Sequence, residues 1–358
     1  MTSELRDFAS GKLGGLDDAQ RGGAVRSLLV FLLFISVMTA IAVGGGGYFA
    51  YQEATRAGPH ENDQVVLLKP GSSVGGIAAA LQQAGVIRHK ELFKAVARVK
   101  GVTGDMKAGE YQIPAEISVW ELVDLIVDGK SLLHYITVVE GQTTAQILEQ
   151  IRQDEKLGGE LTLTPSEGAL LPETYAFTRG HTRDQMVTQM MKAHDAFIDS
   201  VWQERALELP FSTREEAVIL ASIVEKETGL AVERPQIAAV FVNRLRRGMR
   251  LESDPTIIYG LTGGEPLGRG LRVSEIRKET PYNTYQIRGL PPGPIANPGK
   301  DAILAVLHPA ESDDLFFVAD GSGGHAFAKT LTEHNRNVAN WRRVERQMRE
   351  SAAARADD

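Results

Sequence analysis

The chain has 358 residues, of which 24% are charged and 43% hydrophobic, as is usual for a folded protein. Its 39 Lys and Arg against 46 Asp and Glu give a net charge of −7. Nucleic-acid binding depends on a basic surface, so we expect no nucleic-acid partner. The absence of cysteine excludes disulfides, thiolate nucleophiles and Cys-bound metal clusters. The length allows two or three domains.

An apolar segment near the N-terminus is long enough to cross a membrane. Residues 27–51 carry no formal charge, and roughly 20 helical residues span a hydrocarbon core of about 30 Å. A buried core helix is the alternative, although such a helix rarely lacks charge over this length. We therefore predict a transmembrane anchor over 27–51.

The charges on either side of this segment predict its orientation. Arg6, Lys12, Arg21 and Arg26 precede it, whereas Arg56 alone stands between it and Lys69. The positive-inside bias then leaves residues 1–26 as a cytoplasmic tail and places the rest of the chain outside. A cleaved signal peptide is the competing interpretation, because 40–42 has the small-x-small form. The long leader favours an uncleaved anchor.

The part after the anchor reads as two α+β regions. A polar linker over 52–63 leads to a small unit over 64–133, with strands predicted at 65–68 and 108–113 and a helix at 119–127. A larger mixed α+β domain follows over 134–345. It opens with a strand predicted at 136–139 and a helix capped by Thr143 and Thr144. The tail over 346–358 is predicted to be disordered.

One helix of the larger region carries two carboxylates near its end. Thr213 and Glu216 form a predicted capping box before an apolar run that ends in Glu225, Lys226 and Glu227. Helical periodicity puts Glu227 about 20° from Leu220, on the apolar side. Burial there would raise the pKa of Glu227 and suit a general acid. On pattern alone, the interpretation of both glutamates as solvated helix charges is favoured, because charged helix flanks are usual.

The next motif is an acidic turn that follows a basic stretch. The pair Asp254 and Pro255 predicts an extended or turn conformation. Asp254 could contact a ligand, although capping of the following segment is the simpler interpretation. The basic stretch 243–247 is typical of a solvated helix face.

Two loops combine aromatic, polar and proline residues. Tyr282, Asn283, Thr284 and Tyr285 precede a segment, 289–299, that holds four prolines. Such a segment forms a rigid loop. Aromatic faces beside hydrogen-bonding groups suit a sugar polymer, but turn chemistry alone would also explain the prolines.

A strand at 316–320 runs into a glycine-rich turn that ends at His325. The spacing of phosphate-binding loops is missing, and so is a zinc ligand set such as HExxH. We expect no metal and no cofactor. His325 lines a site or satisfies local backbone groups.

Taken together, these motifs resemble the endolytic murein transglycosylase (YceG-like) family. The resemblance rests on the ordered segments ASIVEKET, VFVNRL, SDPTIIYGL, TPYNTY, GLPPGPIANPG and FFVADGSGGHAF, and covers about 65–345. It implies a LysM-like peptidoglycan-binding subdomain over 64–133 and a catalytic transglycosylase domain over 134–345. It further implies an inner-membrane enzyme whose catalytic part faces the extracytoplasmic side.

The resemblance also implies the residues of the site. The second glutamate of the E-K-E-T motif, here Glu227, is the catalytic residue of the family. Asp254 is the candidate for orienting the substrate or Glu227. The substrate-binding residues implied are Glu173, Asn243, Asp254, Tyr282, Asn283, Thr284, Tyr285 and His325.

The implied activity is cleavage of the β-1,4 bond between MurNAc and GlcNAc in peptidoglycan strands, leaving a 1,6-anhydroMurNAc end. Association with peptidoglycan synthases is expected, because a tethered enzyme meets strands where they emerge. Two alternatives stay open. One is a peptidoglycan hydrolase in which Asp254 or Glu173 activates water. The other is a non-catalytic wall-binding scaffold.

Overall fold

The computed structural model describes residues 18–356, with backbone only for 18–25 and 351–356. The described chain is mixed α and β. It divides into two compact units, one ending at Leu132 and one beginning at Leu133. The first 17 residues of the predicted cytoplasmic tail lie outside the described residues.

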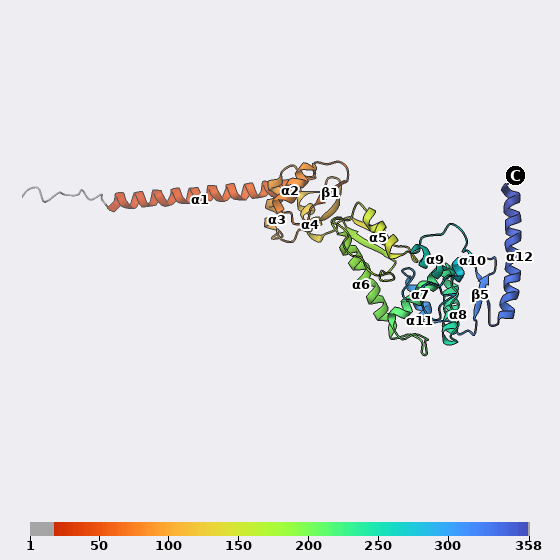
Figure 1. Cartoon of the computed structure of the whole chain (residues 1–358). Helices are drawn as coiled ribbons and strands as arrows, with labels where there is room; N and C mark the ends of the chain where they lie inside the picture. The colour runs from red at the N-terminus through yellow and green to blue at the C-terminus, as the bar shows by residue number, and fades with distance from the viewer. Residues whose placement is uncertain (1–17, 357–358) are drawn as a thin grey trace, which may run out of the picture. The chain divides into compact units, whose positions relative to one another are not determined.

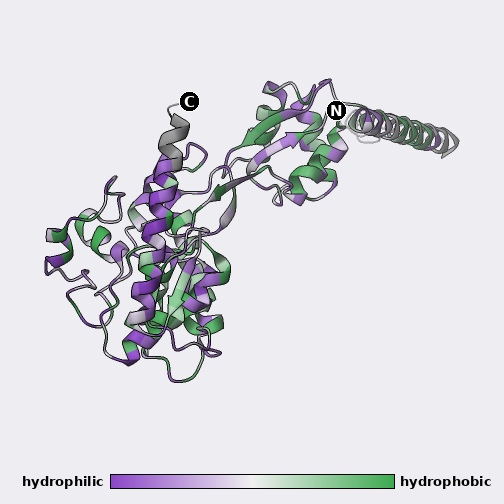
Figure 2. Ribbon diagram, turned by 90° about the vertical axis from the view of Figure 1, so that its right-hand side faces the viewer, coloured by the Kyte–Doolittle hydropathy of each residue, from purple (hydrophilic) through white to green (hydrophobic). Residues whose placement is uncertain are grey.

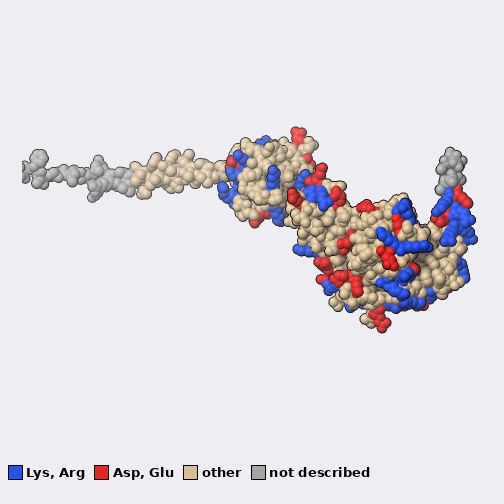
Figure 3. All heavy atoms as spheres, in the orientation of Figure 1, with Lys and Arg blue, Asp and Glu red and all other residues tan. Residues whose placement is uncertain are grey.

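The N-terminal helix α1, Asp18–Thr55, contains the predicted anchor. Its stretch Arg26–Thr55 is long and apolar enough to cross a membrane, and its apolar window has no burial within the protein. Figure 2 shows the apolar character along this helix, and Figure 3 shows it almost free of charged side chains. The helix runs four residues into the predicted linker, because Ala54 packs in the core of the first unit.

The first unit is a two-stranded antiparallel sheet covered by helices. Its strands pair with Val66 opposite Tyr111, and alternate residues of both strands enter one apolar core. Ser118 forms a capping box with Glu121 at the start of the last helix. The elements are β1 Gln64–Leu68, α2 Val74–Gln83, α3 Lys90–Val99, β2 Gly109–Ile113 and α4 Val119–Asp128.

The second unit opens with another antiparallel pair of strands and two helices that share a core. The strand predicted at 136–139 lies earlier in the structure, because its register with the partner strand places Thr137 opposite Thr174 at the end of the ladder. Thr143 forms a capping box with Gln146. The elements are β3 Leu133–Thr137, α5 Thr144–Gln153, β4 Thr174–Thr178 and α6 Arg183–Trp202.

A helical core follows and positions the candidate site. Figure 1 shows α7, Arg214–Glu227, beside α8, Arg234–Arg246, and α11, Lys300–Leu307, and both neighbours pack on it. Residues 217–224 of α7 are therefore buried on every side. The predicted capping box of Thr213 and Glu216 is confirmed. The remaining elements are η1 Ala231–Glu233, α9 Asp254–Thr262, α10 Val273–Arg277, β5 Phe316–Ala319 and β6 His325–Ala328.

The chain ends in a long helix, α12, Leu331–Ala356. The prediction of a disordered tail is wrong from 346 to Ala356. The segment contains no proline or glycine and is rich in alanine, arginine and glutamate, which are strong helix formers. Figure 3 shows basic side chains along this helix.

Candidate active site

The candidate site begins where α7 ends. Glu227 is the last residue of the helix, and its carboxylate oxygen Oε1 accepts a hydrogen bond of 2.5 Å from the Ser253 hydroxyl. The fully buried stretch of α7 ends only three residues earlier. The Glu227 side chain therefore stands at the border between an apolar core and a polar loop.

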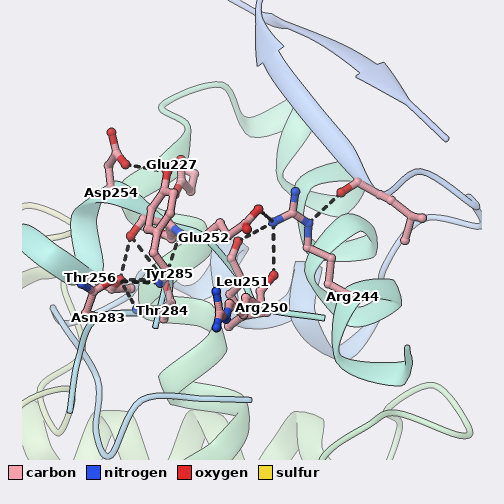
Figure 4. A network of polar contacts seen from close by, with 12 residues as sticks. Glu227, Arg244, Arg250, Leu251, Glu252, Asp254, Thr256, Asn283, Thr284 and Tyr285 are labelled. Atoms are coloured by element: carbon pink, nitrogen blue, oxygen red, sulfur yellow. Dashed lines mark hydrogen bonds and ion pairs between the residues drawn. The ribbon is translucent and has the colours of Figure 1, made fainter. Parts of the chain in front are cut away.

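Ser253 is itself fixed by two buried threonines. Its backbone N–H donates to Thr284 Oγ1 at 2.9 Å, and its carbonyl accepts from Thr256 Oγ1 at 2.6 Å. The two threonine hydroxyl oxygens lie 2.8 Å apart. Ser253, Thr256 and Thr284 are at most 1% exposed. This network, drawn in Figure 4, holds the donor that faces Glu227 in one position.

The environment of Glu227 changes its acidity. Burial raises the pKa of Glu227 to about 7, and the neighbouring Asp254 charge acts in the same direction. The Ser253 hydrogen bond, followed by charges on His325 and Arg244, lowers the pKa and offsets part of the effect. Close to neutral pH the carboxyl group can therefore both give and take a proton, as a general acid–base catalyst must.

A second carboxylate lies next to this one. Asp254 is exposed, and its Oδ1 accepts a hydrogen bond of 2.8 Å from the Tyr285 hydroxyl. Burial, followed by this hydrogen bond, raises the pKa of Tyr285, which keeps the phenol a donor. Figure 4 shows Asp254, Tyr285 and Glu227 in the same network. These three groups are distant in the sequence, and only the tertiary fold brings them together.

Two expectations about Asp254 are wrong. The residue does not sit in an extended segment, because helix α9 begins at this position with Pro255 in its first turn, where a missing N–H costs nothing. Nor does Asp254 cap the helix. The N-cap residue is Ser253, whose hydroxyl is used on Glu227 instead of on the backbone.

Arg244 supports the turn that carries Ser253, and the sequence interpretation missed it. Its side chain is 8% exposed, and its guanidinium donates to the carbonyls of Leu315 at 2.7 Å and Leu251 at 2.9 Å. It also pairs with Glu252 at 3.1 Å, a residue with φ of +52°. The basic stretch is therefore not a wholly solvated face. Arg244 follows buried Phe241 by three positions, a spacing that would have revealed its inward direction.

His325 and Tyr282 lie on separate segments, His325 at the start of β6 and Tyr282 in the loop between α10 and α11. His325 Nδ1 is 2.7 Å from the carboxylate of Glu233, a residue that the sequence analysis did not select. The Tyr282 ring packs against Tyr259 at 4.9 Å between centroids, and the Tyr259 hydroxyl donates to Glu167 at 3.2 Å.

The three remaining predicted site residues make structural contacts within the protein. The Asn283 amide, 1% exposed, donates to the carbonyls of Ile276 and Lys278 at 3.0 and 2.7 Å. The Asn243 amide donates to backbone carbonyls of the segment before β5. Glu173 pairs with Lys300 at 2.5 Å. The partners of these three side chains are backbone groups and Lys300, and Glu227 is not among them.

A cavity of about 680 Å³ lies along the N-terminal half of α7. Its lining includes Glu215, Val218 and Tyr282, but not Glu227. Val218 lies nine residues before Glu227 and so about 180° around the helix. The cavity is therefore distinct from the surroundings of the carboxylate. Among the described residues, no group of three or more His, Asp or Glu is arranged to hold a metal ion.

These features define a class of protein. A partly buried carboxylic acid with a pKa close to neutrality, held by a serine in a rigid polar loop, is typical of an enzyme that uses general acid–base catalysis. The sequence model of the YceG-like family matches residues 66–340. Because this range is well over half of the chain, the protein belongs to the YceG-like family.

Known relatives agree with this assignment. A Bacillus subtilis (strain 168) protein named endolytic murein transglycosylase is 29% identical over 327 residues, which are 81% of this chain and 89% of the relative. A protein of the same name from Streptococcus pneumoniae serotype 2 is 29% identical over 365 residues. That alignment covers 87% of this chain and 64% of the relative, less than two thirds of its length.

One solved structure is also similar. A crystal structure of a protein described as yceG-like, from Listeria monocytogenes, has 30% sequence identity to this chain. The match covers 77% of this chain and 99% of that one, with a TM-score of 0.48.

Proposed function

We propose that the protein is a membrane-anchored lytic transglycosylase that cuts the β-1,4 bond between MurNAc and GlcNAc within peptidoglycan strands and so limits their length. The observation that carries this proposal is the position of Glu227 at the end of α7, where its carboxylate accepts a hydrogen bond from the buried Ser253 and where burial raises its pKa to about 7. The names of the relatives from Bacillus subtilis and Streptococcus pneumoniae support the substrate.

The proposed reaction uses one carboxyl group twice. Protonated Glu227 donates its proton to the glycosidic oxygen while positive charge develops on the MurNAc ring. The resulting carboxylate then removes the proton of the C6 hydroxyl of the same sugar, and the C6 oxygen closes on C1. The product is a 1,6-anhydroMurNAc end, and no water is consumed. Hydrolytic glycosidases normally need two carboxylates.

The neighbouring groups assist this proton cycle. The Ser253 hydroxyl stabilises the carboxylate that Glu227 becomes after the first transfer, because a hydrogen bond to an anion is stronger than one to a neutral acid. The Asp254 charge is placed to favour the positive sugar ring. Tyr285 orients Asp254 through its hydroxyl. Tyr282 and His325 are proposed contacts for the glycan.

The remaining parts of the chain fit a tethered enzyme. We propose that 27–51 cross the inner membrane once, with 1–26 in the cytoplasm and both folded units outside. The first unit, 64–133, is proposed to be a LysM-like peptidoglycan-binding subdomain, and 134–345 the catalytic domain. Association with a peptidoglycan synthase would place the enzyme on emerging strands.

Hydrolysis of the same bond is the second candidate. The exposed Asp254 beside Glu227 favours it, because a solvated carboxylate can activate water. Glu173, the other candidate base, is instead paired with Lys300.

Product analysis tests the proposal. The full chain in detergent is incubated with purified sacculi, and the soluble fragments are weighed by mass spectrometry. A lytic transglycosylase yields ends one water lighter than those of a hydrolase. Fragments whose ends have the mass expected for hydrolysis would support the second candidate and contradict the first. Binding to sacculi without any soluble fragments would support a scaffold.

The acidity of Glu227 predicts a pH profile. Because the first step needs the protonated acid, kcat/KM should fall as pH rises through about 7, the pKa of Glu227. The Ser253 hydrogen bond lowers this pKa, so Ser253→Ala should move the falling limb to higher pH. Ser200→Ala is the matched control, because Ser200 bonds only within α6. If the fall of kcat/KM occurred at the same pH in Ser253→Ala as in the parent, Glu227 would not be the group that determines this fall.

A further inference from the structure

Glu233 contacts His325 through both oxygens of its carboxylate. Glu233 Oε1 accepts the backbone N–H of His325 at 2.9 Å, and Glu233 Oε2 lies 2.7 Å from His325 Nδ1. The two side chains are only 15% and 16% exposed. Ninety-two residues separate them in the chain, so this contact joins the segment after α7 to the first residue of β6.

The approach of Glu233 depends on a close fit. A Cβ atom at Gly324 would lie 2.5 Å from Glu233 Oε1, so a larger residue would push the carboxylate away. The hydroxyl of Thr228, the residue directly after Glu227, lies 3.5 Å from Glu233 Oε2. Glu233 therefore connects the C-terminal end of the Glu227 helix to the turn that carries His325.

The chemistry of the pair fixes the hydrogen positions. An ionised carboxylate only accepts hydrogen bonds, so the hydrogen between Glu233 and His325 belongs to Nδ1. In the neutral ring, Nε2 is then an acceptor. The ring of Phe317 meets the imidazole edge-on at 5.3 Å and restricts its tilt. His325 is also close enough to Glu227 that, in its protonated form, its charge lowers the pKa of that carboxyl group.

We propose that Glu233 is a positioning residue that keeps the imidazole hydrogen of His325 on Nδ1, so that the Nε2 lone pair accepts a hydrogen bond from a glycan hydroxyl beside Glu227. This inference rests on the proposed function, because it names the group that the histidine contacts. Glu233 itself acts only through His325 and does not touch the substrate.

The Glu233→Gln variant tests the tautomer directly. The glutamine oxygen can still accept the His325 backbone N–H, but its NH₂ group then faces Nδ1 and donates to it. The ring hydrogen should move to Nε2. Nitrogen-15 spectra of the full chain in detergent, labelled at histidine, should show His325 as the Nδ1–H form in the parent and the Nε2–H form in the variant. His325→Asn identifies the signal by removing it.

Activity on sacculi tests the consequence. In Glu233→Gln a donor faces the hydroxyl that needs an acceptor, so kcat/KM should fall about tenfold, the size expected for one mismatched hydrogen bond. His325→Asn keeps a donor for Glu233 but lacks Nε2, and should lose a similar factor. The double variant should lose no more than either single one, because both changes remove the same bond.

A matched control separates the proposed positioning role of Glu233 from a purely structural role. Glu333 also binds backbone N–H groups through its carboxylate, at the start of α12 and without an imidazole. Glu333→Gln should change neither the His325 spectrum nor kcat/KM. The inference is overturned by an unchanged tautomer in Glu233→Gln, by full activity despite a changed tautomer, or by additive losses in the double variant. Inactivity of the parent chain on sacculi would instead overturn the proposed function itself.

Discussion

Replacing Glu227 with glutamine is expected to lower kcat for glycan cleavage by at least about 10²–10⁴, the usual contribution of a general acid–base group. The amide still accepts the Ser253 hydrogen bond, which is 2.5 Å long in the parent protein, so the loop should stay in place. It can neither protonate the glycosidic oxygen nor deprotonate the C6 hydroxyl. Fragment release from sacculi, followed over time, measures the loss.

The control lies on the same helix. Glu215 is exposed at the N-terminal end of α7, and Glu215→Gln removes the same charge without touching the Ser253 loop. This variant should cleave at the parental rate. If Glu227→Gln released fragments as fast as Glu215→Gln, the catalytic assignment would be wrong, and another acid would have to be found.

The same Glu227 substitution is expected to stabilise the fold at alkaline pH. The ordinary pKa of a glutamate is 4.5, whereas burial raises that of Glu227 to about 7 in the folded protein. The favourable protonated form is fully populated below 4.5, and its contribution to stability is lost as pH rises through 7. Glutamine is never charged, so the variant does not lose this contribution.

The expected gain is on the order of 2 kcal/mol at pH 8 to 9, allowing for the partial exposure of the side chain, and about zero at pH 4. Denaturant unfolding of the full chain in detergent at several pH values measures it. Gain of stability on loss of a catalytic group is common, because active sites hold charges in unfavourable surroundings. Equal stability of the two proteins at pH 9 would show that Glu227 is not held in such surroundings.

Local signals predicted much of the fold. The helix caps at Thr143 and Thr213 and the two strands of the first unit, but not the pairing of these strands, were predicted, because caps and strand patterns depend on neighbours within a few residues. The register of β3 was not, since it depends on a partner strand about forty residues later. The helical tail was missed because a chain terminus was expected to be disordered, although its composition favours a helix.

The candidate site was predictable only in part. The helical periodicity favoured Glu227 over Glu225 as the candidate acid. The surroundings of the two carboxylates differ, however, because of tertiary contacts that periodicity does not predict. Glu225 bonds to Arg234 and to the Gly299 backbone, whereas Glu227 faces Ser253. Tertiary packing determines which distant residue is the hydrogen-bond partner of each carboxylate. The spacing of Arg244 from Phe241 was the one overlooked signal that the sequence did contain.

The most direct measurement of the central claim is cleavage of sacculi by the full chain in water enriched in oxygen-18. If the Glu227 carboxylate takes the proton of the C6 hydroxyl and the C6 oxygen closes on C1 of the same sugar, the new ends carry no heavy oxygen. Mass spectra of the fragments should then show the anhydro ends at their unlabelled mass. Heavy oxygen at the newly formed reducing ends would contradict this account and identify water as the nucleophile.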